Sequence, residues 1–147
     1  MIEKKISTND SKFSEGKIIS DVIAKSQDNL IKELNINFKK WTVALNQSLR
    51  ENLFLIFFCS YTQIPLFLVG KPGSSKSISI EILMQELGPP KSTKKFLEKW
   101  NLPSLKPFYI QCSPITTALG ITKIFEQARS YASHLDPENA LSVVIFG

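Results

Sequence analysis

The segment at residues 70–77 is the feature that most constrains what this chain can fold into. It reads GKPGSSKS, follows the apolar run 64–69 and opens the apolar segment 76–87. Such a loop between a buried strand and a helix is typical of phosphate binding, because its backbone N–H groups and the helix N-terminus favour an anion. The sequence therefore predicts a P-loop NTPase fold of the α/β class, with a parallel sheet and flanking helices.

The loop side chains predict binding of ATP or ADP with Mg²⁺. Lys76 is expected to reach the terminal phosphates, and the hydroxyl of Ser77 to ligate the metal. Ser75 departs from the consensus G-x-x-x-x-G-K-[ST], because it stands where glycine is usual, so its backbone must tolerate the loop geometry. A flexible surface turn is the alternative interpretation. The predicted nucleotide-binding residues are Gly70, Gly73, Ser74, Ser75, Lys76 and Ser77.

The rest of the chain divides into three predicted parts. Residues 1–17 are polar and expected to be disordered, residues 18–62 form a helical lead-in of two helices, and residues 63–147 form a partial P-loop domain. Within that domain, the apolar patterns predict strands at 64–69, 108–112 and 141–146 and helices at 76–87 and 121–135. A short helical piece is predicted at 96–100, inside the basic connection 91–107. The sequence does not show what this connection does.

Composition excludes several classes of protein. The net charge is +5, and the lysines are spread without a dense basic run, so a nucleic-acid partner is not predicted. The polar start lacks the apolar core of a secretory signal, which leaves a cytosolic or nuclear location, and a cytoplasmic one is the expectation. The apolar stretch 53–69 is interrupted by Thr62, Gln63 and Pro65, so no membrane span is expected.

No catalytic residue is predicted in this chain. Cys59 and Cys112 are too far apart for a metal site and are expected to be buried thiols. His134 is expected to be solvated or to cap its helix. The acidic residues are expected to be exposed and the tryptophans to be packed; these are Glu126, Asp136, Glu138, Trp41 and Trp100.

Two stretches, RENLFLIFFCSYTQIPLFLVGKPGSSKSISIEIL and ITKIFEQARSYASHLDPENALSVVIF, resemble an AAA+ unit of the mysterin-type giant ring-finger ubiquitin ligases. The serine before the loop lysine is shared with that family. The resemblance covers residues 50–146 with gaps and is most specific at IPLFLVGKPGSSKS. It implies ATP and Mg²⁺ binding in a core of several AAA+ units, with neighbouring units or the rest of a larger chain as partners and ubiquitin transfer carried elsewhere.

In that family the strand resembling residues 141–146 leads into an Asp-Glu pair that holds magnesium and orients water, whereas Gly147 follows here. The expectation is a fragment that binds nucleotide and does not hydrolyse it alone. Three alternatives stay open. They are a non-catalytic regulatory or assembly module, a self-sufficient P-loop NTPase or small-molecule kinase, and a fragment that does not fold stably.

Overall fold

The structure is a computed structural model that describes residues 7–89, 95–134 and 140–147. It divides the chain into two units, Met1–Asn37 and Phe38–Gly147. The first unit consists of helix α1, Ser7–Leu34, and the few residues around it. The second unit carries all the other elements and the loop of interest.

Helix α1 begins earlier than the sequence predicts. It starts at Ser7, so the expected disorder of residues 1–17 is not what the structure has at 7–17, and residues 1–6 lie outside the described range. A helix satisfies its backbone hydrogen bonds within its own segment, so a polar sequence can continue one that an apolar stripe has begun. The stripe that predicted this helix, from Ile18 to Leu34, forms its second half.

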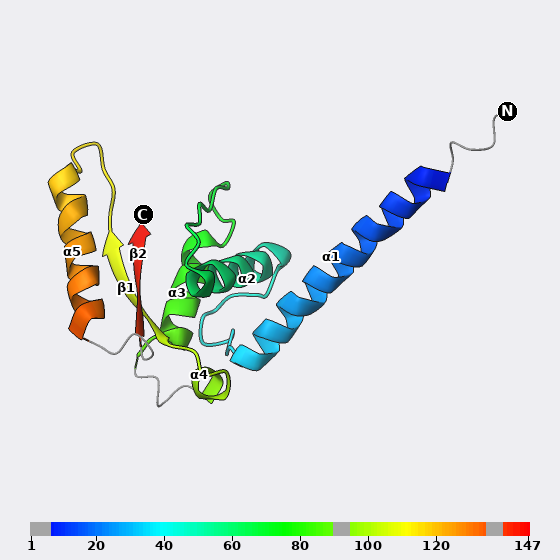
Figure 1. Cartoon of the computed structure of the whole chain (residues 1–147), viewed down its shortest axis with the longest axis horizontal. Coiled ribbons are helices and arrows are strands. Elements are labelled where there is room, and N and C mark those ends of the chain that lie inside the picture. Colours follow the sequence, from blue (N-terminus) through cyan, green and yellow to red (C-terminus); the bar gives the residue numbers. More distant parts are fainter. Residues whose placement is uncertain (1–6, 90–94, 135–139) are drawn as a thin grey trace. The chain divides into compact units, whose positions relative to one another are not determined.

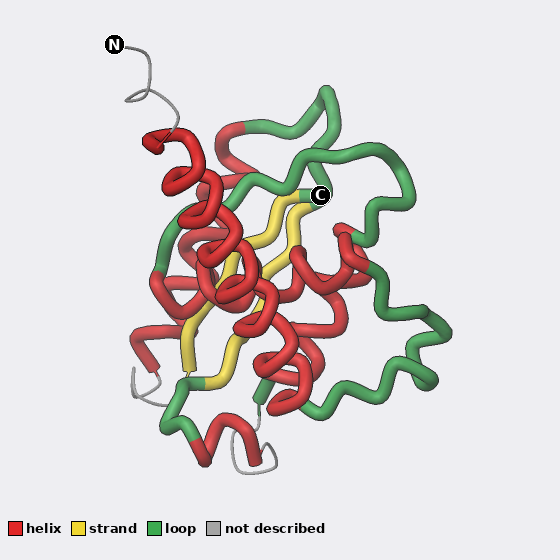
Figure 2. The backbone as a smooth tube through the Cα atoms, turned by 90° about the vertical axis from the view of Figure 1, so that its right-hand side faces the viewer, coloured by secondary structure: helices red, strands yellow, loops and turns green. Residues whose placement is uncertain are grey.

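The second unit is built on a parallel pair of strands. Strand β1, Ser104–Ile110, pairs with β2, Ala140–Phe146, in a register that sets Ser104 opposite Ala140 and Ile110 opposite Phe146. Figure 2 shows the two strands running side by side. Helix α5, Ala118–His134, lies between them in the chain, as parallel pairing requires of a crossover.

Helices cover both sides of this sheet. Helix α5 contacts both strands, α3, Lys76–Leu87, contacts β1, and α2, Gln47–Thr62, packs on α3. Figure 1 shows α5 and α3 on opposite sides of the two strands. The side chains that are fully buried come from α2, α3, the short α4, Lys95–Lys99, and β1, and they include Leu49, Leu53, Ile82, Leu83, Leu87, Leu97 and Leu105.

Local chemistry sets the ends of the helices beside the loop. The side chain of Asn46 caps α2 by accepting a hydrogen bond of 2.8 Å from the N–H of Leu49. Gln63 ends α2 in a left-handed conformation, φ 56°, and the N–H of Ile64 returns to the carbonyl of Cys59. Helix α3 stops before Gly88, where a Cβ would lie 2.5 Å from the carbonyl oxygen of Met84.

Two strand predictions need correction. Residues 64–69 form no strand, because among the described residues the sheet consists of β1 and β2 alone and the run has no neighbour to pair with. The strand predicted at 108–112 lies at Ser104–Ile110 and runs through Pro107. Proline is tolerated in a strand with an unpaired edge, where its missing N–H costs no ladder bond.

The α/β class with a parallel sheet and flanking helices is confirmed. Among the described residues this sheet has two strands. The predicted helix 76–87 has the bounds that α3 has, and the helical piece at 96–100 corresponds to α4. No helix among residues 7–89, 95–134 and 140–147 has both the length and the apolar content to cross a membrane.

Candidate phosphate-binding site

The loop lies between residues 64–69, which have no regular secondary structure, and the first turn of α3. It closes on itself through a turn in which the N–H of Ser74 donates to the carbonyl of Lys71 at 3.2 Å. Its last two predicted residues, Lys76 and Ser77, are the first two residues of α3. The predicted order of loop and helix is therefore present, and the side chains of the motif lie at a helix N-terminus.

Backbone angles explain the small residues of the loop. Gly73 has φ 82°, a conformation that glycine adopts without strain. Ser75 has φ 60° and ψ 15°, so this serine stands in the left-handed region where glycine is usual. At Gly70 a Cβ would lie 2.8 Å from Oγ of Ser74, which would displace that hydroxyl.

Lys76 folds back over the loop. Its Nζ donates to the carbonyl oxygens of Gly70 at 2.8 Å and Lys71 at 3.0 Å, and lies 2.9 Å from Oγ of Ser74. Oxygen atoms of the loop itself therefore hold the ammonium group of Lys76. Since the two bonds to carbonyls are exposed, exchanging them for bonds to a phosphate does not require burial of a charge.

The first N–H groups of α3 are free to receive an anion. Backbone N–H groups of Ser75, Lys76, Ser77 and Ile78 have no acceptor among the residues that the structure describes, and Ser75 makes no side-chain cap. The hydroxyl of the exposed Ser77 is likewise without a partner in those residues. Together with the positive end of the helix dipole, these donors make a site that favours a negative group.

Two residues that the sequence interpretation missed hold the loop in place. Nδ2 of Asn52, on α2, donates to the carbonyl of Ser74 at 2.9 Å. Ser79, fully buried on α3, donates to the carbonyl of Ser75 both from its N–H at 3.0 Å and from its Oγ. The sequence could have pointed to both residues, because each is a polar residue within an apolar helix, and a buried polar side chain needs a hydrogen-bond partner.

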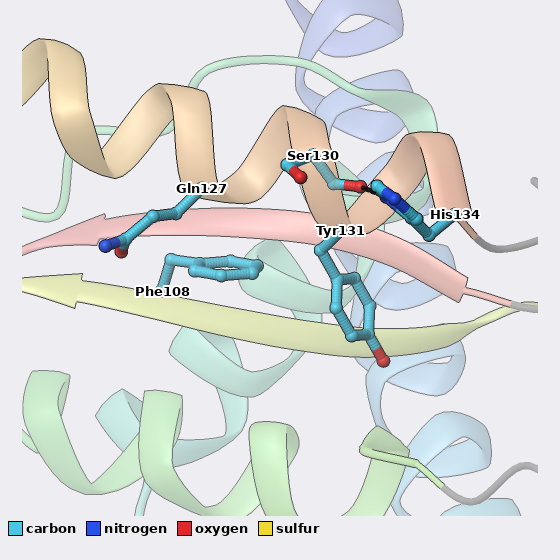
Figure 3. A pocket seen from close by; sticks show the side chains of 5 residues that line it. All are labelled: Phe108, Gln127, Ser130, Tyr131 and His134. Carbon is cyan, nitrogen blue, oxygen red and sulfur yellow. Dashed lines mark hydrogen bonds between the residues drawn. The ribbon is translucent and has the colours of Figure 1, made fainter.

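A second hollow lies on the other side of the sheet, between β1 and α5. Figure 3 shows its lining, with the rings of Phe108 and Tyr131 at a centroid distance of 5.8 Å. Its volume is about 510 Å³, and Gln127, Ser130 and His134 complete the lining. Nδ1 of His134 lies 2.6 Å from the carbonyl of Ser130, on its own helix. The shallow, mainly apolar surface brings no set of charges or metal ligands together.

The other sequence expectations have mixed outcomes. Cys112 is exposed rather than buried, because it follows the end of β1, whereas Cys59 is half-buried, and both are free thiols. His134 is exposed, as expected, while Asp136 and Glu138 lie outside the described residues. Trp100 packs against Phe96 and is still 55% exposed. No cluster of three potential metal ligands occurs among the described His, Cys, Asp and Glu residues.

The chain is similar to a known family of domains. Residues 42–147 match the family described as the RNF213 AAA domain. The chain is 32% identical over 133 residues to E3 ubiquitin-protein ligase RNF213 of Homo sapiens and 34% identical over 133 residues to E3 ubiquitin-protein ligase rnf213-beta of Danio rerio. It is 32% identical over 134 residues to RNF213 of Mus musculus. These alignments cover 90% of this chain and 2% of each relative, so the chain spans a small part of their length.

Proposed function

Because this chain belongs to the RNF213 AAA domain family, we propose that its loop at residues 70–77 binds ATP or ADP together with Mg²⁺. The family membership confirms the resemblance to giant ring-finger ubiquitin ligases. The observation that carries the proposal is the row of unpartnered N–H groups at the start of α3, beside the ammonium group of Lys76.

The described residues fit a nucleotide phosphate and its metal. The N–H groups from Ser75 to Ile78 would donate to phosphate oxygens, and Lys76 would exchange its loop carbonyls for the terminal phosphate. The free hydroxyl of Ser77 would ligate Mg²⁺, a cation that prefers oxygen ligands and keeps several waters. The bound metal would neutralise part of the phosphate charge.

The binding test is a calorimetric titration of ADP and Mg²⁺ into the wild-type chain and Lys76→Ala. Loss of the charge-assisted contact is expected to weaken binding by about 1.5–3 kcal/mol. Lys123→Ala, which removes the same charge from an exposed position on α5, is the control and should bind as the wild type does. Equal affinity of wild type and Lys76→Ala would refute the proposal.

Hydrolysis by the polypeptide of these 147 residues should be negligible. Residues 70–77 contain no acidic side chain, so the loop itself supplies no base to orient a water beside the phosphate. By resemblance to AAA+ units, a neighbouring unit would supply an arginine finger that the isolated polypeptide lacks, and loss of this group alone typically costs about 10³- to 10⁵-fold in rate. Phosphate release is the measurement. Turnover that Lys76→Ala abolishes would favour a self-sufficient NTPase or small-molecule kinase, and nucleotide that only raises the melting temperature would favour a regulatory module.

The proposal also concerns the context of the domain. The relatives are ubiquitin-protein ligases of far greater length, so the proposed partners are neighbouring AAA+ units or the rest of a larger chain, in the cytoplasm. Ubiquitin transfer is not assigned to the residues described, since the loop chemistry is that of phosphate binding.

A further inference from the structure

The loop is attached to a second helix through a single side chain. The carbonyls of Gly70, Lys71 and Ser75 are held by Lys76 and Ser79, which both belong to α3. The carbonyl of Ser74 instead accepts from Nδ2 of Asn52, on α2, at 2.9 Å. Among the described residues, no other side chain outside the loop and α3 bonds to the loop.

This bond fixes the direction of one peptide plane. The carbonyl of Ser74 and the N–H of Ser75 belong to the same flat, trans peptide unit and point in opposite directions. Holding the oxygen toward α2 therefore aims the N–H of Ser75 away from α2. That N–H is the first of the unpartnered donors that would meet a phosphate.

The backbone of Ser75 favours the opposite orientation. Its φ of 60° brings Cβ close to backbone atoms, a strain that glycine would not have. Rotation of the peptide plane changes ψ of Ser74 and φ of Ser75 together, so half a turn takes Ser75 to a negative φ and relieves the strain. The same rotation turns the N–H of Ser75 away from the phosphate site.

We propose that Asn52 is a positioning residue that keeps the peptide between Ser74 and Ser75 in the orientation that phosphate binding needs, an inference that rests on the proposed nucleotide binding. A carbonyl partner can be satisfied only by a donor, so the amide nitrogen of Asn52 is the group that matters. The residue acts through the backbone and does not touch the ligand.

The first test is a titration of ADP and Mg²⁺ into Asn52→Leu, which removes the donor from a half-buried position and keeps a side chain of similar size. Affinity is expected to fall roughly three- to tenfold, the range for loss of one neutral hydrogen bond. Gln47→Leu on the same helix is the matched control, because the Gln47 amide donates only to Glu51. Asn52→Ala repeats the test with a smaller side chain.

A double-mutant cycle separates positioning from stability. In a Ser75→Gly background neither peptide orientation is strained, so Asn52→Leu should cost about twofold or less. In the nucleotide-free chain, the three-bond coupling between the HN and Hα protons of Ser75 reports φ. It should change in Asn52→Leu and stay unchanged in Gln47→Leu.

The outcomes distinguish the two proposals. Wild-type affinity in Asn52→Leu, or the same loss with and without Ser75→Gly, would overturn the role of Asn52 and leave the loss in Lys76→Ala intact. Absence of binding by the wild type would refute nucleotide binding, and the role of Asn52 with it. An unchanged Ser75 coupling in Asn52→Leu would overturn the inference whatever the titrations show.

Discussion

Two apolar segments flank the loop, and they differ in burial. Residues 64–69 lead into it, and Phe67 and Val69 there are 88% and 95% exposed. Helix α3 leads out of it, and Ile82, Leu83 and Leu87 are fully buried. Both segments have the composition of a protein core, so hydrophobicity does not account for the difference.

The difference lies in how each conformation satisfies its backbone. A helix makes its hydrogen bonds within one segment and can dock a face wherever a surface is available. A strand needs a neighbour for its N–H and carbonyl groups, and residues 64–69 have none among the described residues. Residues 64–69 therefore lie outside the sheet of the described residues and leave Phe67 and Val69 exposed.

Truncation of one large side chain on each side of the loop should have very different effects on stability. Leu83→Ala opens a cavity in the core and should lower the free energy of unfolding by about 2–5 kcal/mol. Phe67→Ala should change it by less than about 0.5 kcal/mol, because the ring is already in solvent. Urea denaturation gives both values. A loss in Phe67→Ala as large as that in Leu83→Ala would show that residues 64–69 are packed.

A smaller effect is expected where α2 contacts the connection to β1. The hydroxyl of Tyr61 donates to the carbonyl of Pro103 at 2.9 Å, so Tyr61→Phe should cost about 0.5–1.5 kcal/mol of unfolding free energy. This bond joins α2 to the residues before β1, so its loss should leave the exposed residues 64–69 unaffected.

Burial also raises the pKa of Tyr61, which makes the effect depend on pH. The unfolded phenol titrates near its ordinary pKa of about 10, below the folded one. Stability from Tyr61 is therefore fully present below about pH 10 and is lost as pH rises through the folded pKa. Alkaline denaturation curves should be shallower for Tyr61→Phe than for wild type, and parallel curves would contradict the assignment.

The smallest effect is expected at the junction of the two segments. Ser75→Gly removes the strain of a left-handed serine, about 1–2 kcal/mol, and adds unfolded-chain entropy worth about 0.4–1 kcal/mol. A net gain between about 0 and 1.6 kcal/mol should appear in urea denaturation, with nucleotide affinity kept or increased. Ser75→Ala keeps the Cβ and serves as control. A severe loss of affinity in Ser75→Gly together with Ser75→Ala would show instead that the hydroxyl contacts the ligand.

The sequence alone determined the loop and the local elements around it. The bounds of α3, the short α4 and the helical parts of α2 and α5 follow from periodicity, caps and breakers, which act within a few residues. Lys76 and Ser77 at a helix start, and the conformational demand on Ser75, likewise follow from the letters of residues 70–77.

Only the tertiary structure decided which of these elements pair and which polar groups meet. The unpaired state of residues 64–69, the start of β1 before Pro107 and the exposure of Cys112 all depend on neighbours distant in the sequence. The bond from Asn52 to Ser74 joins residues 22 positions apart. No local pattern encodes such a contact, because it forms only when α2 packs on α3 and brings the amide to the loop.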